Sequence, residues 1–398
     1  MAGPWLVRDA ETFAQLESVV GTSPGALAAG DAFKCKSDLF YKRVQARYDR
    51  DGDRDNGMAS VVDTLVGRSK GQYELSGDVI PNGNAAAPTA PDIEVLIEAH
   101  LGAKNLATAH TTTHGSTPCT TTVLNLVAGG GAASGLRTGG GDIVLVDVDG
   151  TNGLEARRTV SRATDAVTVS PALSAIPGVG RAVYTGCTFN LSQTALKTAH
   201  LWGYLSGNNF RHKLPGAIAR MLNIDYDAGN DTPVVTWKLS GDSYPVETHA
   251  TSRPTPTTAG VPLLPSQAKV FLSTSGKLCP VKVGLASDNG IELRETDGCA
   301  LTPSGVKRTG NNSRYMVTLA LDLLLQSGTI ENLFDNAGAL TGYDTVVQFG
   351  VTPGQTVVIC APKWKPDVDP ANAADEVSLA LAGRCYGSAT GDDELIMG

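Results

Sequence analysis

The stretch YELSGDVIPNGNAAAPTAPDIEVLIEAHLG, residues 73–102, holds the clearest structural signals of the 398-residue chain. Its beginning belongs to a segment, residues 71–80, for which we predict a β-strand. Its end predicts an amphipathic helix, because Pro91 and Asp92 suit a helix start and Gly102 suits a helix end. One face of this helix carries the apolar residues Ile93, Leu96, Ile97 and Leu101. We expect the helix to cover a β-sheet.

Strand signals continue on both sides of this stretch. Residues 36–48 alternate between apolar and polar side chains, which predicts a strand that runs into the polar loop DRDGDRDNG, residues 49–57. Further strands are predicted, several with a period of two, at VFLSTS (270–275), CPVKVGLA (279–286), RYMVTLALDLLL (314–325) and QTVVICAP (355–362). Short helices are expected over residues 13–20 and over residues 330–336, the second capped by Thr329.

The glycine-rich run at residues 129–141 precedes strands predicted in DIVLVDVDG (142–150) and at residues 166–170. We expect a small β insertion at about residues 130–185, bounded by flexible hinges. The Pro- and Thr-rich residues 252–267 form the best candidate linker. The fold class is therefore mainly β: two antiparallel β-sandwich domains, residues 1–250 with the insertion and residues 251–398, each with a flanking α-helix.

One internal repeat stands out, between YELSGDVIP at residues 73–81 and WKLSGDSYP at residues 237–245. Both have the form aromatic-x-Leu-Ser-Gly-Asp-x-x-Pro. A chance match is the alternative to this interpretation. The repeat fits paired strands in a duplicated architecture.

Composition excludes several classes of protein. The net charge is −8 and the pI is near 5.3, whereas a protein that grips nucleic acid by its phosphates needs a basic face. No apolar run approaches the length of a membrane-spanning helix, so we expect no membrane partner. The seven cysteines are scattered singly, with no CxxC, which favours reduced, mostly buried thiols in a cytoplasmic setting.

Two motifs could indicate chemistry. GTSPG at residues 21–25 matches the G-x-S-x-G turn that carries a nucleophile, here Ser23, but that turn needs a strand before it and a helix after it. In the polar loop, Asp51, Asp53 and Asp55 alternate as in a calcium loop. Asn56 and Val62, however, occupy the positions that require Gly and Glu. A coincidental turn and a solvated loop are favoured, with weak cation binding as the alternative for the loop.

The histidines and the glycine clusters do not indicate a metal-binding or phosphate-binding site more strongly than these two motifs indicate chemistry. His110, His114 and Cys119 could suggest zinc, but no second pair lies at a useful spacing. His100 lies at the edge of the predicted helix and is interpreted as a packed histidine. The glycine clusters lack the order of strand, loop and helix that phosphate binding needs. We predict no catalytic, cofactor-binding or metal-binding residues, and not an enzyme.

Several segments occur in an order that resembles the tail tube (major tail) proteins of long-tailed bacteriophages of the siphophage type. They are LSGDVIPNGNAAAPTAPDIEVLIEAHLG (75–102), LPGAIARMLNIDYDAGNDTPVVTWKLSGDSYPV (214–246), ICAPKW (359–364) and the terminal GDDELIMG (391–398). The resemblance spans residues ~70 to 398. The N-terminal ~30 residues and the insertion have no counterpart in it.

The resemblance implies a structural virion protein that stacks as rings into a hollow tube through which the genome passes during infection. Its partners would be copies of itself, in trimeric rings with pseudo-sixfold symmetry, and other tail proteins (tape measure, terminator and distal tail). It implies tail-tube-type β-sandwiches whose sheets join between neighbours, with the polar loop bridging stacked rings. Its location would be the virion tail, after assembly in the host cytoplasm.

An acidic lumen would let DNA slide instead of binding. The sequence does not decide which of Asp51, Asp53, Asp55 and Glu74 would face it, and the run at residues 49–57 is instead the candidate for a loop tip between rings. No cofactor is expected. The alternatives are a virion adhesin or decoration protein and a divergent β-rich hydrolase.

Overall fold

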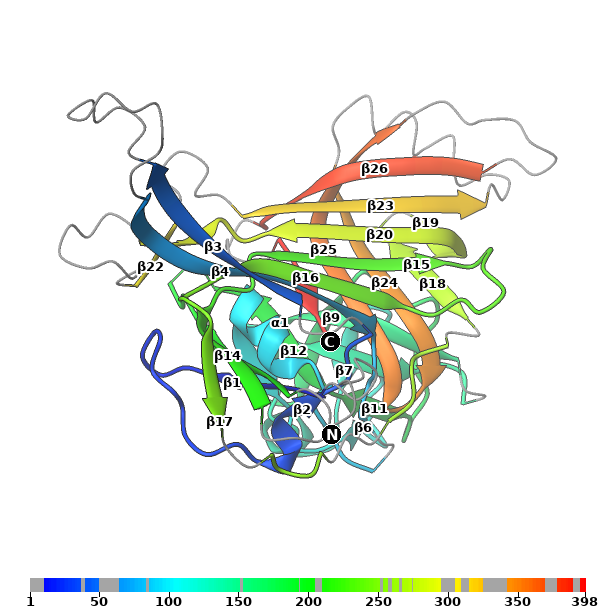
Figure 1. The fold of residues 1–398 in the computed structure, drawn as a ribbon. Coiled ribbons are helices and arrows are strands. Elements are labelled where there is room, and N and C mark those ends of the chain that lie inside the picture. Colours follow the sequence, from blue (N-terminus) through cyan, green and yellow to red (C-terminus); the bar gives the residue numbers. More distant parts are fainter. Residues whose placement is uncertain are drawn as a thin grey trace, which may run out of the picture.

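The computed structural model shows a mainly β protein with large antiparallel sheets (Figure 1). It describes residues 11–36, 40–49, 64–83, 86–150, 153–192, 194–204, 210–250, 253–256, 260–264, 267–273, 275–294, 305–308, 315–324, 342–368, 378–388 and 394–398. Most of the polar loop and all of the helix predicted at residues 330–336 lie outside these residues.

The described elements include two α-helices, α1 (Glu94–Leu101) and α2 (Gly130–Ala133), and a 3-10 turn, η2 (Ala29–Asp31). The strands are β1 (Glu11–Leu16), β2 (Ala32–Phe33), β3 (Phe40–Asp49), β4 (Thr64–Asp78), β5 (Gly102–Leu106), β6 (Thr111–Thr112), β7 (Val123–Asn125), β8 (Ile143–Asp147), β9 (Leu154–Ala163), β10 (Ala166–Ser170), β11 (Ala182–Thr185), β12 (Cys187–Leu191), β13 (Ala199–Tyr204), β14 (Phe210–Ala217), β15 (Met221–Asp227), β16 (Thr236–Ser243), β17 (Glu247–Ala250), β18 (Ala268–Leu272), β19 (Ser275–Leu278), β20 (Pro280–Asp288), β21 (Ile291–Leu293), β22 (Val306–Arg308), β23 (Met316–Leu324), β24 (Tyr343–Thr352), β25 (Gln355–Val368), β26 (Ser378–Tyr386) and β27 (Ile396–Met397).

The largest sheet contains two groups of four strands with the same internal order. The first quartet consists of four strands that lie in the sheet in the order β3-β4-β16-β15. Numbered by their order in the sequence, these are the first, second, fourth and third strands of the quartet. The second quartet, β20-β23-β26-β25, repeats that order. All neighbours within the two quartets are antiparallel. The chain therefore carries one four-strand arrangement twice.

The two quartets are joined by the pairing of β15 with β20, which we call the seam. Its register is continuous, from Met221 opposite Asp288 to Asp227 opposite Lys282. The seam connects strands that lie on either side of residue 250. One hydrogen-bonded sheet therefore contains strands of both predicted domains.

Helix α1 packs beneath this sheet, as its apolar face predicts. Ile93, Leu96, Ile97 and Leu101 are all buried in the main core together with residues of both quartets. Burying each such side chain contributes about 2 kcal/mol. Gly102 ends the helix in the left-handed region, with φ 97°, where a Cβ would lie 2.7 Å from the carbonyl oxygen of Ala195.

A five-stranded sheet, β17-β14-β13-β1-β2, lies on the α1 side of the molecule (Figure 1). The helix predicted at residues 13–20 is wrong, because β1 occupies Glu11–Leu16 as the central partner of β13 and β2. Phe13 is fully buried against Tyr204, with ring centroids 5.5 Å apart. Cross-strand packing of this kind overrides the weak local helix preference.

The insertion is a small β barrel that begins earlier than predicted. Its order is β6-β11-β8-β9-β10-β7, and the bridge from Thr113 to Leu126 brings β6 back to β7. Its strands thus span residues 111–185. The glycine-rich run at residues 129–141 lies in the sequence between two of the barrel's strands, β7 and β8, and not at the boundary of the insertion. There the backbone N–H groups of Gly129 and Gly131 donate to the Asp165 carboxylate, at 2.9 and 3.0 Å.

Candidate assembly interface

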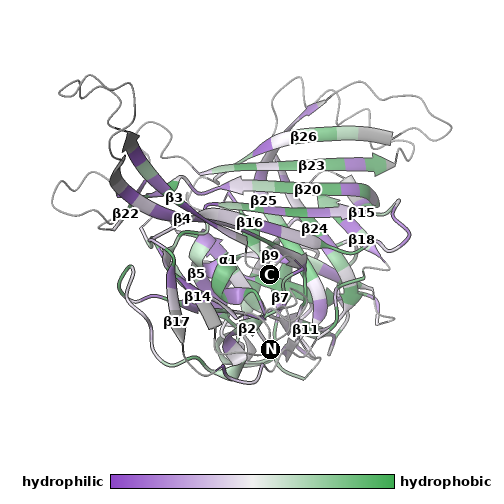
Figure 2. Ribbon diagram, viewed as in Figure 1, coloured by the Kyte–Doolittle hydropathy of each residue, from purple (hydrophilic) through white to green (hydrophobic). Residues whose placement is uncertain are grey.

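One face of the two quartets points away from the core. In β4, Tyr73 and Leu75 are buried while Glu74 between them is exposed, and the same alternation continues through β16, β15, β20 and β23. Figure 2 shows hydrophilic and hydrophobic residues interleaved along these strands. Because residues opposite each other in register share a face, the ladder pairings carry this assignment across all eight strands. We call this surface the outer face.

The eight strands end in two edges. Within the described residues, β3 pairs with β4 alone and ends the sheet. At the other end, β25 is the last strand of the second quartet but continues the same sheet: residues up to Trp364 pair with β24, and Lys363–Val368 pair with β26. On the side away from β26, residues 365–368 have no ladder partner among the described residues. Sheet edges of this kind can accept a strand from another chain.

On the core side of the sheet, a buried polar network around His100 connects helix α1 to the strands of the seam. Its Nδ1 donates to the carbonyl oxygen of Ala219 at 2.7 Å, and its Nε2 accepts from the hydroxyl of Ser287 in β20 at 2.7 Å. The amide of Asn289 donates to the carbonyl oxygens of Ala219, at 2.8 Å, and His100, at 3.2 Å. Burial lowers the pKa of His100 to about 4, against the opposing effects of the Ala219 hydrogen bond and the Asp288 charge. The interpretation of His100 as a packed histidine is confirmed.

The repeated Leu-Ser-Gly-Asp segments lie in neighbouring strands of the same quartet. In the β4–β16 ladder, Leu75 is opposite Leu239, and Trp237 is opposite Gly77. The Trp237 indole donates to the carbonyl oxygen of Asp78 at 3.0 Å. The prediction of paired strands is therefore confirmed, but the duplication of the chain is carried by the strand order of the quartets and not by this repeat.

The candidate chemical motifs do not converge. Ser23 follows strand β1 and a turn, and the next regular element is the single turn η2, so the helix that the nucleophile turn requires is missing there. His114 Nδ1 accepts from the backbone N–H groups of Ser116 and Thr117. Cys119 Sγ accepts from the N–H of Asn125. Among the described residues, no three His, Cys, Asp or Glu side chains gather as metal ligands.

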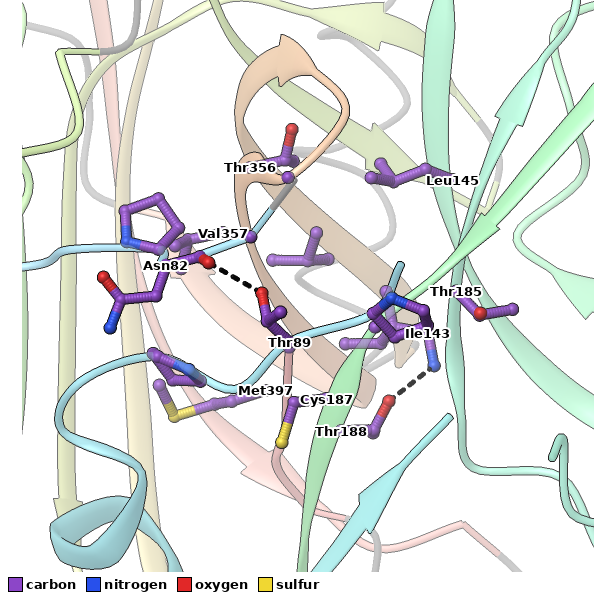
Figure 3. A pocket seen from close by; sticks show the side chains of 18 of the residues that line it. Asn82, Thr89, Ile143, Leu145, Thr185, Cys187, Thr188, Thr356, Val357 and Met397 are labelled. Atoms are coloured by element: carbon purple, nitrogen blue, oxygen red, sulfur yellow. Dashed lines mark hydrogen bonds between the residues drawn. The ribbon is translucent and has the colours of Figure 1, made fainter. Parts of the chain in front are cut away.

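A mostly apolar cleft with a volume of about 100 Å³, open to solvent, lies between the barrel, β12 and the β24–β25 hairpin (Figure 3). Its wall is ordered by hydrogen bonds from the Ile143 N–H to the Thr188 hydroxyl and from the Thr89 hydroxyl to the Asn82 carbonyl. Burial raises the pKa of the Cys187 thiol at this cleft to about 12. The thiol is therefore protonated, and a poor nucleophile, at neutral pH.

Sequence reasoning missed both edges and the seam network. The alternating pattern of MLNIDYD, residues 221–227, identifies a strand with carboxylates on one side. Pairing this strand with β20 needs long-range register, for which the sequence carries no local signal.

Comparison of the chain with models of known families gives no match, and neither does comparison with curated proteins. None of the helices in the described part of the chain is long and apolar enough to cross a membrane.

Proposed function

We propose that this chain is a structural protein that polymerises, through the edges of its large sheet, as stacked rings into a hollow tube of the kind that forms bacteriophage tails. The observation that carries the proposal is the repeated strand order of the two quartets, joined by the seam. A chain that already joins one quartet to the next can join further copies in the same way.

The seam indicates which edges meet. It pairs the third strand of the first quartet, β15, with the first strand of the second, β20, in antiparallel fashion. The corresponding strands left at the two ends are β25 and β3. Antiparallel pairing of residues 365–368 of β25 in one copy with β3 in the next would form a shorter version of the seam between chains. Such a head-to-tail contact closes into a ring if the rotation permits it.

We propose three chains per ring, because two equivalent quartets in each chain then give pseudo-sixfold symmetry. Each half would be a β-sandwich domain, in which a quartet packs on the remaining strands and a helix. The tube would belong to a virion tail and assemble in the host cytoplasm with tape measure, terminator and distal tail proteins. DNA would pass through it without binding.

Electron microscopy of the concentrated protein tests the tube, and native mass spectrometry tests the ring. We expect tubes with a regular axial repeat and a three-chain species. Six whole chains per ring would refute the pseudo-sixfold arrangement. A protein that stays monomeric at all concentrations would refute polymerisation and favour an adhesin or decoration protein.

The proposed edge contact has its own test in two proline variants, Lys42→Pro and Arg43→Pro. Successive residues of an antiparallel strand direct their N–H groups to opposite sides, so one of these two residues points to β4 and the other to the free edge. We expect one variant to lose stability and the other to stay folded but form no tubes. If the folded variant still forms tubes, β3 is not the contact.

A further inference from the structure

The outer face carries both signs of charge in close alternation, although the chain as a whole is acidic. Its cations are Lys42, Lys70, Lys238, Lys282, Lys363, Lys365 and Arg384. Its carboxylates are Glu74, Asp78, Asp225, Asp227, Asp242, Asp288, Asp322 and Asp367. A purely repulsive surface would contain no such set of cations.

Three of the lysines are held by carboxylates on the neighbouring strand. Lys70 Nζ lies 3.0 Å from Asp242 Oδ2, and Lys238 Nζ lies 2.7 Å from Glu74 Oε1, both between β4 and β16. Across the seam, Lys282 Nζ lies 3.0 Å from Asp227 Oδ2. Each pair therefore crosses from one strand to the next.

The Asp227 carboxylate is also positioned from its other side. It accepts a hydrogen bond from the Gly229 N–H at 2.9 Å, which is the largest cause of its lowered pKa, followed by the Lys282 hydrogen bond. The same contact raises the pKa of Lys282, so both partners stay charged across the neutral range.

Stability gives little reason for these three pairs. All six side chains are partly or largely solvent-exposed, and exposed ion pairs are screened by water and contribute little to folding. Their consequence lies instead in how the surface meets a polyanion.

Affinity for DNA comes largely from lysines and arginines that neutralise phosphates and release the counterions of the DNA. A lysine held by a carboxylate can do so only after its own pair breaks. We infer that Glu74, Asp227 and Asp242 mask Lys238, Lys282 and Lys70 from DNA phosphates. The three ion pairs thus lower the number of lysines with which the outer face can bind the duplex. This inference rests on the proposed function, and it identifies the outer face as the surface along which DNA passes.

The test compares the full-length wild-type chain with two triple variants. Glu74→Gln/Asp227→Asn/Asp242→Asn unmasks the three lysines. Glu11→Gln/Glu94→Gln/Glu247→Gln changes the net charge equally at ion pairs elsewhere, with Arg253, Lys104 and Lys213. Binding to a fluorescent duplex DNA is measured at several salt concentrations, with the protein dilute enough to remain monomeric. Circular dichroism checks that each variant is folded.

We expect the unmasked variant to show a slope of log affinity against log salt steeper than that of the wild type by about 2.7, from roughly 0.9 for each freed lysine. That corresponds to about a 40-fold additional loss of affinity between 50 and 200 mM salt. The control variant should keep the wild-type slope. Should the triple variant not fold, Glu74→Gln alone should steepen the slope by about 0.9.

Equal slopes in all three proteins, or equal steepening in the control, would overturn the masking. Tube formation is scored separately by electron microscopy. Normal wild-type tubes with equal slopes would refute only the masking, whereas absence of wild-type tubes would refute the function.

Discussion

His100 should make the fold sensitive to mild acid. Its imidazole is buried under the seam and must stay neutral there, because Nε2 accepts the Ser287 hydroxyl while Nδ1 donates to a carbonyl. Burial lowers its pKa from 6.5 to about 4. A histidine with a lowered pKa in the folded state contributes stability that is fully present above pH 6.5 and is lost as the pH falls toward 4. From pH 7 to pH 5 this one group should remove about 2 kcal/mol.

The measurement is the free energy of unfolding by urea at pH 7 and pH 5, for the wild type and for His100→Gln. Other groups titrate equally in both proteins, so the difference between their pH dependences isolates His100. The wild type should lose about 2 kcal/mol more than the variant over this range. If His100→Gln proves too unstable, NMR titration of the wild-type imidazole gives the pKa directly. Equal pH dependences, or a His100 pKa near 6.5, would refute the reasoning.

Three further predictions follow from buried polar groups. Burial raises the pKa of Asp92 to about 6, so stability falls as the pH rises from 3.8 to 6. At pH 7, Asp92→Asn should raise the free energy of unfolding by about 1–2 kcal/mol, measured by urea unfolding. Gln348 is fully buried and joins the barrel to β24 through its bond to the Ala156 N–H at 2.7 Å. Gln348→Ala should cost about 2–4 kcal/mol and speed hydrogen exchange at Ala156. Arg157→Met should cost about 3–5 kcal/mol in thermal unfolding, because it leaves the Glu155 carboxylate buried and unpaired, and Glu155→Gln in the same chain should recover part of that loss.

Local patterns predicted the elements whose signals are local. The α1 helix has its start residues, apolar face and Gly102 within one short stretch, and the strand at residues 166–170 matches β10. The prediction of a helix at residues 13–20 was wrong because the residues that pair with β1 lie about 190 residues away, in β13. The prediction of a flexible hinge at the glycines of residues 129–131 was wrong because Asp165, which accepts hydrogen bonds from the N–H groups of Gly129 and Gly131, comes from a distant turn. The edges and the seam depend on which strands pair, and this is decided by tertiary packing.

The seam also bears on how assembly would depend on concentration. It forms when the chain folds, so its formation is intramolecular and independent of how many copies are present. Each association between separate chains gives up translational and rotational freedom worth about 4–15 kcal/mol. If rings form as proposed, every second quartet-to-quartet junction escapes that loss, since its two sides are already tethered. Half as many bodies then have to meet to close a ring, and closure should begin at a lower protein concentration than for a chain with a single quartet.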